Sequence, residues 1–184
     1  MSLQTEILEQ PEVLGRLLQN QRHEVAHIAA EIRKRDIQYV FLAARGTSDN
    51  AGRYANYLWG ARNGLPLALA TPSLFTYYHE PPRLKGALVV GVSQSGQSPD
   101  ICSVVEEGKH QGCMTLAITN APDSPLAQTS DFVLNIEAGK EAAVAATKTY
   151  TAELMAIAML SAALQDNETS WQELAGVSGW VSKV

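Results

Sequence analysis

Five short apolar runs, separated by helix-like segments, constrain the fold of this chain more than any other feature. Each run is almost continuously hydrophobic and does not alternate with polar residues. Such runs are typical of strands that are buried on both faces of a parallel sheet. We therefore predict an α/β fold, a three-layer α/β/α sandwich with a five-stranded parallel sheet. The five runs are Tyr39–Ala44, Pro66–Ala70, Ala87–Val92, Met114–Thr119 and Phe132–Ile136.

The order of the strands is limited by the connections between them. Right-handed crossovers leave few topologies for five parallel strands, and the natural choice is the flavodoxin-like order 2-1-3-4-5. This order places a crevice between the first and third strands, where a ligand site is expected.

Helix-like segments flank the strand region at both ends. Apolar residues recur at helical spacing from Gln10 to about Lys34, which predicts one long amphipathic helix or two. We divide the chain into a helical arm over residues 1–35, a ligand-binding domain over 36–166 and a C-terminal helix over 167–184. Because the amphipathic pattern continues to Val184, we expect the last helix to lead to a second domain that is absent here.

The acidic composition limits the partners. A formal net charge of -5 at pH 7 argues against nucleic acid and anionic membranes, so any anion must be bound locally. The longest apolar run, Leu154–Leu164, is shorter than the roughly 20 residues of a membrane helix. No signal peptide begins the sequence, and Cys102 and Cys113 lack metal-ligand spacing. We expect a cytoplasmic protein with no nucleic-acid or membrane partner.

A loop rich in hydroxyl groups follows the third predicted strand. Its sequence, Ser-Gln-Ser-Gly-Gln-Ser, runs into a helix that Pro99 and Asp100 suit as first-turn residues. The glycine permits close backbone approach, and the serine hydroxyls and free helix amides can donate to phosphate oxygens. We interpret this loop as a phosphate site, against the alternative of an ordinary polar loop with a good helix cap. The candidate ligands are Ser93, Gln94, Ser95, Gly96 and Ser98.

The loop after the first predicted strand faces the same crevice. It offers Gly46, Thr47 and Ser48 from the other side. Arg45 stands at the mouth of the crevice, where it could meet an anion or form a salt bridge with Glu141 or Asp49; we favour the salt bridge.

Two segments match nucleotide-binding motifs only in part. Residues 91–98 lack the lysine of the G-x-x-x-x-G-K-[ST] phosphate loop, because Gln97 stands in its place. Residues 45–52 contain no G-x-G-x-x-G, which disfavours a dinucleotide. The sequence therefore favours a monophosphate ligand and no cofactor.

The remaining chemical motifs are weak. His23-Glu24-Val25-Ala26-His27 matches the H-E-x-x-H pattern of zinc peptidases, but the helix precedes the sheet and its polar face should be solvated, so we predict no metal site. Lys148, near the start of the helix after the fifth strand, is either a phosphate-reaching amine or a structural residue.

Three ordered motifs together resemble the sugar isomerase (SIS) domain family. The sequence is most similar to the first of two SIS domains in the isomerase portion of glutamine:fructose-6-phosphate amidotransferases and their shorter relatives. The opening segment, residues 6–11, is similar to the E-I-x-E-Q-P sequence that begins that portion. The motifs are Gly46-Thr47-Ser48, Ser93-Gln94-Ser95-Gly96 and Glu141-x-x-Val144-Ala145-x-Thr147-Lys148.

The resemblance assigns roles to these residues. It implies that the residue 93–98 loop holds the phosphate of a sugar monophosphate, that Thr47 and Ser48 contact the sugar and that Val144 lines its pocket. Ser98 replaces the usual threonine of the family, and Gln97 replaces its glutamate. The catalytic glutamate, histidine and lysine of the two-domain relatives lie in a second domain and tail that this sequence does not contain.

We therefore expect the N-terminal half of a phosphosugar isomerase, aminosugar deaminase or aminotransferase that binds fructose 6-phosphate or glucosamine 6-phosphate without efficient turnover. The alternatives are a complete single-SIS isomerase and a non-catalytic phosphosugar sensor. The apolar faces of the first helix and of residues 152–164 exceed the need of one sheet face, which predicts a homodimer.

Overall fold

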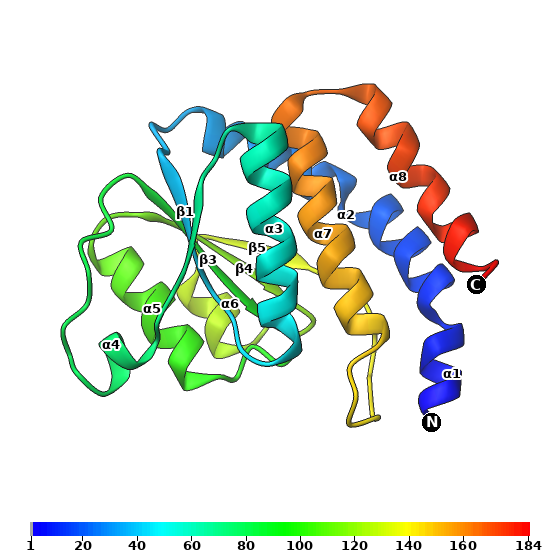
Figure 1. Ribbon diagram of the computed structural model, residues 1–184, viewed down its shortest axis with the longest axis horizontal. Helices are drawn as coiled ribbons and strands as arrows, with labels where there is room; N and C mark the ends of the chain where they lie inside the picture. The colour runs from blue at the N-terminus through cyan, green and yellow to red at the C-terminus, as the bar shows by residue number, and fades with distance from the viewer. Residues whose placement is uncertain (1) are drawn as a thin grey trace.

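The computed structural model, which describes residues 2–184, confirms the predicted sandwich (Figure 1). Five parallel strands form one sheet in the order β2-β1-β3-β4-β5. The strands are β1 (Tyr39–Ala43), β2 (Leu67–Leu69), β3 (Ala87–Ser93), β4 (Met114–Thr119) and β5 (Phe132–Asn135). The helices are α1 (Leu3–Leu8), α2 (Gln10–Arg33), α3 (Thr47–Asn63), α4 (Ser73–Thr76), α5 (Pro99–His110), α6 (Pro125–Thr129), α7 (Lys148–Gln165) and α8 (Glu168–Val181).

The central strands are buried along their whole length. Every residue of β3 and β4 is buried, which explains why their sequences are apolar without alternation. The edge strand β2 is shorter and more exposed than the rest. All five strands run parallel, so their carboxyl ends meet at one edge of the sheet.

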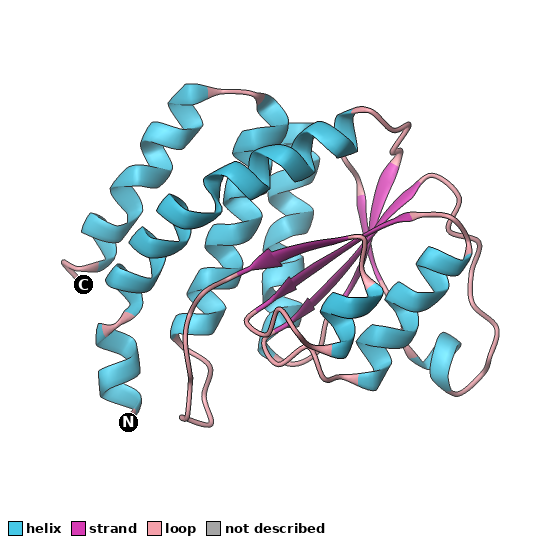
Figure 2. Cartoon of the chain, turned by 180° about the vertical axis from the view of Figure 1, so that it is seen from behind, coloured by secondary structure: helices cyan, strands magenta, loops and turns pink. Residues whose placement is uncertain are grey.

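Two helical layers cover the sheet, as the view from behind also shows (Figure 2). Helices α2, α3 and α7 enclose the larger core on one face, and α4, α5 and α6 enclose a second core on the other. Trp59 of α3 ties the larger layer together, because its indole Nε1 donates to the carbonyl of Ile157 at 3.1 Å. Within residues 2–184, every helix is too short or too polar to cross a bilayer.

Helix α7 is apolar nearly all round because it is buried inside the chain. It packs between α2 and α3 and also contacts α8. Residues 152–164, taken above as evidence for a dimer, are therefore largely covered by helices of the same chain. The argument from this helix is wrong, and the homodimer itself stays a prediction.

The N-terminal helical segment divides into two helices. α1 ends at Leu8, and α2 begins at Gln10 with Pro11 in its first turn, where proline is tolerated. α2 contributes Leu14, Leu17 and Ile28 to the core of the sheet. The division at residues 35 and 166 remains a proposal.

Candidate functional site

Loops that follow β1 and β3 meet at the carboxyl edge of the sheet. The two strands are hydrogen-bonded neighbours, with Ala43 in register with Gly91. Parallel pairing therefore brings the Gly46 loop and the Ser93 loop to the same place. α7 also reaches this place, because its residue Glu153 contacts Ser48.

The loop after β3 is held by short-range hydrogen bonds. The backbone N–H of Gly96 donates to Ser93 Oγ at 3.1 Å, and the N–H of Gln97 donates to Ser95 Oγ at 3.3 Å. Both hydroxyl oxygens are therefore acceptors inside the loop, and their protons remain available to a ligand. Ser98 is the N-cap residue of α5 as predicted, but among the described residues its side chain caps no amide.

The position of Gly96 in this loop requires a residue without a side chain. Its φ is +60°, in the left-handed region, and it is buried. An added Cβ would lie 2.0 Å from Ser124 Oγ. The carbonyl of Gly96 accepts from the N–H of Leu126 at 3.2 Å, so this turn is also fixed to the start of α6.

The loop after β1 turns directly into α3. Gly46, with φ +59°, is the N-cap residue, and Thr47 is exposed at the helix start. Ser48 is buried, and its hydroxyl donates to Glu153 Oε1 at 2.8 Å. The two predicted sugar-contacting residues thus lie at one helix end, and a carboxylate stands behind one of them.

Glu153 is a functional candidate that the sequence analysis missed. It is 1% exposed, and its Oε2 has no hydrogen-bond partner among residues 2–184. Burial raises the pKa of Glu153 to about 7; the Ser48 hydrogen bond opposes this shift and the nearby Glu141 charge adds to it. The sequence feature that could have identified Glu153 is its position as a lone carboxylate in the apolar first half of α7.

Carboxylates organise the loop from Gly139 to Thr147. Glu141 Oε1 accepts from the backbone N–H of Thr147 at 2.9 Å, and its Oε2 accepts from the Thr149 hydroxyl. Although burial raises the pKa of Glu141, hydrogen bonds from Thr149 and Thr147 outweigh it and hold that pKa below the usual value.

The N-terminal helix α1 clamps the same loop. Glu6 is fully buried and accepts from the N–H groups of Ala142, at 2.5 Å, and Ala143, at 3.1 Å. Glu9 accepts from Lys148 Nζ at 2.5 Å. α1 and this loop lie beside each other in both ribbon views (Figures 1 and 2).

Two other predicted site residues, Lys148 and Val144, belong to the segment that follows β5. Lys148 is 3% exposed and its amine donates to Glu9, and its contact with a phosphate stays a prediction. Val144 is fully exposed in the loop, and its contact with a sugar stays a prediction.

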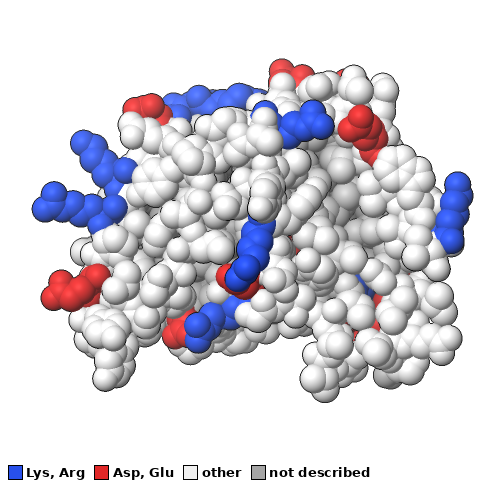
Figure 3. All heavy atoms as spheres, in the orientation of Figure 1, with Lys and Arg blue, Asp and Glu red and all other residues white. Residues whose placement is uncertain are grey.

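Arg45 forms a salt bridge, although with another partner than expected. Its Nη2 lies 3.0 Å from Asp100 Oδ2, at the first turn of α5. Asp49 instead pairs with Arg53, and Glu141 bonds the threonines of its own loop. The expected pairs were wrong because folding brings α5, not these segments, against Arg45. On the face seen in Figure 3, charges of both signs are scattered over largely uncharged surface.

The remaining motifs lie away from the crevice. His23 and His27 are exposed on α2, where the His27 ring meets Phe132 edge-on. No cluster of three or more His, Cys, Asp or Glu residues that could hold a metal occurs in the described part of the chain. His79 and His110 line a separate cavity between α4 and α5 with Phe75.

Comparisons with known proteins bear on the family and fold of the chain. A model of the SIS domain matches residues 31–163. A glutamine–fructose-6-phosphate aminotransferase (isomerizing) from Shouchella clausii is 37% identical over 160 residues, which is 85% of this chain and 26% of that protein.

Solved structures give the same result. A protein from Silicibacter pomeroyi DSS-3, assigned provisionally as a phosphosugar isomerase, superposes with a TM-score of 0.94 at 37% identity over 97% of this chain and 55% of that one. The C-terminal domain of glucosamine-fructose-6-phosphate aminotransferase from Francisella tularensis gives 0.77 at 27% identity over 98% and 52%. The chain thus spans about a quarter of the length of the curated relative and about half of each solved chain.

Proposed function

Because this chain belongs to the SIS domain family, we propose that it binds the phosphoryl group of a sugar monophosphate in the loop between β3 and α5. The observation that carries the proposal is the polarity of this loop. Ser93 and Ser95 accept backbone N–H groups through their oxygens, which leaves both O–H groups to donate to phosphoryl oxygens. The Ser98 hydroxyl and the first amides of α5 add further donors.

We propose that the loop after β1 orients the sugar. Thr47 and Ser48 lie at the start of α3, beside the phosphate loop across the β1/β3 junction. A ligand with its phosphate on the Ser93 loop would extend its carbon chain toward them. Fructose 6-phosphate and glucosamine 6-phosphate are the proposed ligands, in line with the names of the relatives.

The proposed place of this chain is the N-terminal half of a phosphosugar isomerase, deaminase or aminotransferase. In residues 2–184 the groups near the crevice hold and orient a ligand, and the resemblance places proton transfer in a further domain. We therefore expect the isolated chain to bind without efficient turnover. A coupled assay with fructose 6-phosphate that gave turnover typical of enzymes, roughly 10 per second, would contradict this.

The binding proposal is tested by calorimetry with fructose 6-phosphate, glucosamine 6-phosphate, the free sugars and ATP. We expect only the two sugar phosphates to bind. Replacing Ser93 and Ser95 by alanine together should lower affinity about a hundredfold, because each charge-assisted hydrogen bond contributes roughly 1.5–3 kcal/mol. Ser182→Ala, a change at an exposed serine of the α8 end, is the matched control. Unchanged affinity in the double variant, or binding of ATP alone, would overturn the proposal.

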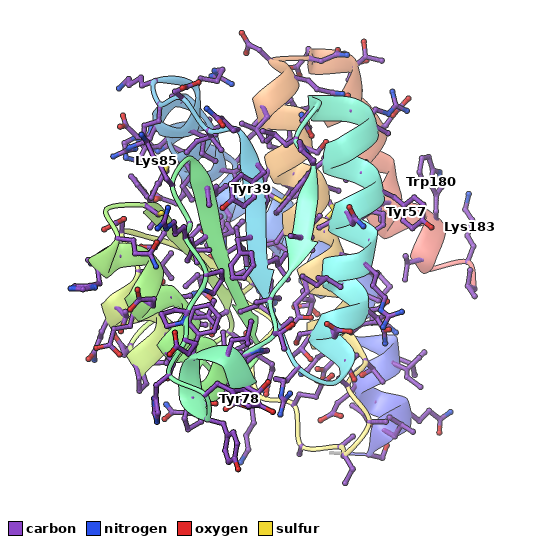
Figure 4. All side chains as sticks on the ribbon, turned by 60° about the vertical axis from the view of Figure 1, so that its left-hand side comes forward. Tyr39, Tyr57, Tyr78, Lys85, Trp180 and Lys183 are labelled. Atoms are coloured by element: carbon purple, nitrogen blue, oxygen red, sulfur yellow. The ribbon has the colours of Figure 1, made fainter. Side chains whose placement is uncertain are left out.

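Self-association and a cytoplasmic location remain part of the proposal. Both cysteines are free, which suits a reducing compartment. Leu8, Tyr57 and Trp180 are exposed by 71%, 82% and 58%, and the latter two point outward in Figure 4. These side chains are candidates for a homodimer contact. A monomer in sedimentation at micromolar concentration would contradict the dimer.

A further inference from the structure

We propose that Glu153 is a positioning residue that accepts the hydrogen bond of the Ser48 hydroxyl, so that Ser48 in turn accepts a hydrogen bond from the sugar and discriminates against a phosphoryl group. The inference rests on the proposed function and adds to it the direction of the hydrogen bond between Ser48 and the ligand. The ligand group that this subsite selects is a hydrogen-bond donor, either a sugar hydroxyl or the ammonium of an aminosugar.

The contact between the two side chains is buried and close. Ser48 Oγ lies 2.8 Å from Glu153 Oε1 and joins the first turn of α3 to the second turn of α7, 105 residues apart. Glu153 is 1% exposed and Ser48 is 8% exposed. An ionised carboxylate is an acceptor only, so at a pH above the raised pKa of Glu153 the one proton of Ser48 lies between the two oxygens. What remains on Ser48 toward the crevice is a pair of acceptor sites.

The hydroxyls of the phosphate loop have the opposite polarity. Ser93 and Ser95 receive N–H donors from Gly96 and Gln97, so their own protons point away from those bonds. Oxygens of a phosphoryl dianion only accept, and against Ser48 they would place lone pairs against lone pairs. The same ligand therefore fits in one direction, with the phosphate on the Ser93 loop and a donor group on Ser48.

The surroundings keep Glu153 available for this role. The amine of Lys148, one turn earlier on α7, is taken up by Glu9. Glu141 is a like charge in the adjacent loop and cannot bond to the Glu153 carboxylate while both are ionised. Within residues 2–184, Ser48 is the hydrogen-bond donor that Glu153 receives, and Oε2 receives none.

Glu153→Gln tests the inference because it should reverse the polarity of Ser48. The partnerless Oε2 position tolerates an amide oxygen better than an amide NH₂, since buried unpaired N–H groups are rarer than under-satisfied oxygens. The new NH₂ should therefore turn toward Ser48 and donate to it, which frees the serine proton. At pH 8.5, where wild-type Glu153 is ionised, we expect affinity for fructose 6-phosphate to fall about fivefold, while inorganic phosphate binds within twofold of wild type.

A thermodynamic cycle with Ser48→Ala separates positioning from a structural effect. If Glu153 acts through Ser48, Glu153→Gln should change affinity less than twofold in the Ser48→Ala background. Circular dichroism and thermal melting of each variant check that it folds. A fivefold loss that persists without Ser48, an equal loss for inorganic phosphate, or no loss in the single variant would each overturn the inference.

The proposed function fails separately. If wild type does not bind fructose 6-phosphate, or if alanine at Ser93 and Ser95 leaves its affinity unchanged, the proposed function falls and the inference falls with it. If those two tests succeed and the Glu153 cycle does not, only the inference is lost.

Discussion

Two groups of serine hydroxyls lie on loops that meet at the carboxyl edge of the sheet, but their hydrogen bonds have opposite directions. Ser93 and Ser95 accept hydrogen bonds from backbone amides, so their O–H groups are available to donate to a ligand. Ser48 donates its O–H to the buried carboxylate of Glu153, so only its lone pairs are available to a ligand. The residue type is the same in both places, so the supporting group sets what each hydroxyl can recognise.

The two supports also differ in their range along the chain. The hydroxyls of Ser93 and Ser95 are supported by bonds that span two or three residues, whereas Ser48 depends on a residue 105 positions away. The neighbouring 139–147 loop depends on α1 over a similar distance, 136 residues from Glu6 to Ala142. The support of the hydroxyls is therefore local on one side of the site, although the Gly96 turn is also fixed to α6, and on the other side it forms only when distant helices pack together.

The largest expected effect tests the phosphate-loop side through Gly96→Ala. The new Cβ would meet Ser124 Oγ at 2.0 Å, and φ is +60°. Strain and overpacking together should lower the free energy of unfolding by about 4 kcal/mol, measured by urea denaturation. Fructose 6-phosphate binding should be lost.

Gly139→Ala is the matched control for this change. Gly139 also has a positive φ, of +68°, but nothing lies within 4 Å of an added Cβ. Its cost should be limited to the backbone term of about 1 kcal/mol. Equal losses in the two variants would show that packing against Ser124 does not shape the phosphate loop.

The next effect tests the long-range side through Glu6→Ala. Removal of the buried carboxylate leaves the amides of Ala142 and Ala143 without an acceptor, at a cost of about 3 kcal/mol in the free energy of unfolding. Hydrogen exchange should become faster at these two amides and stay unchanged at Gly96. Glu12→Ala, at an exposed position on α2, is the control. Slow exchange at both amides in Glu6→Ala would mean that α1 does not hold the loop.

The carboxylate behind Ser48 predicts a pH-dependent stability. The folded-state pKa of Glu153 is about 7, above its ordinary value of 4.5, so the folded protein binds this proton more tightly than the unfolded chain. Wild type should lose stability as pH rises from about 4.5 to 7 and remain level above that range. The full shift corresponds to about 3 kcal/mol, which is the expected difference in stability between Glu153→Gln and wild type above pH 7.

Thermal melting of wild type and Glu153→Gln from pH 4.5 to 8.5 measures this difference. The variant should match wild type near pH 4.5 and exceed it by a constant amount above pH 7. The groups that act on Glu153 are Ser48 from α3 and Glu141 from the loop, while Lys148 is occupied by Glu9. A pH-independent difference would show that Glu153 does not titrate in this range.

The same division explains how much the sequence could predict. Strand order, strand positions and the hydroxyl loop after β3 depend on local patterns and on topology rules, and the structure confirms the fold they predicted. The partners of Arg45, Lys148 and Ser48 depend on which helices pack together. Periodicity shows that α7 is buried but not which face its single carboxylate presents, so Glu153 was not identified before the fold was known.

The smallest expected effect concerns Arg45, the cation at the crevice mouth. If neutral donors hold the phosphate, Arg45→Gln should lower affinity for fructose 6-phosphate by no more than about twofold, because the guanidinium is already paired with Asp100 and solvent-exposed. The free energy of unfolding should change by less than about 0.5 kcal/mol. Arg53→Gln, which breaks a similar exposed pair with Asp49, is the control. A tenfold loss confined to Arg45→Gln, steepest at low salt, would show that charge and not hydroxyl polarity distinguishes the two sides of the crevice.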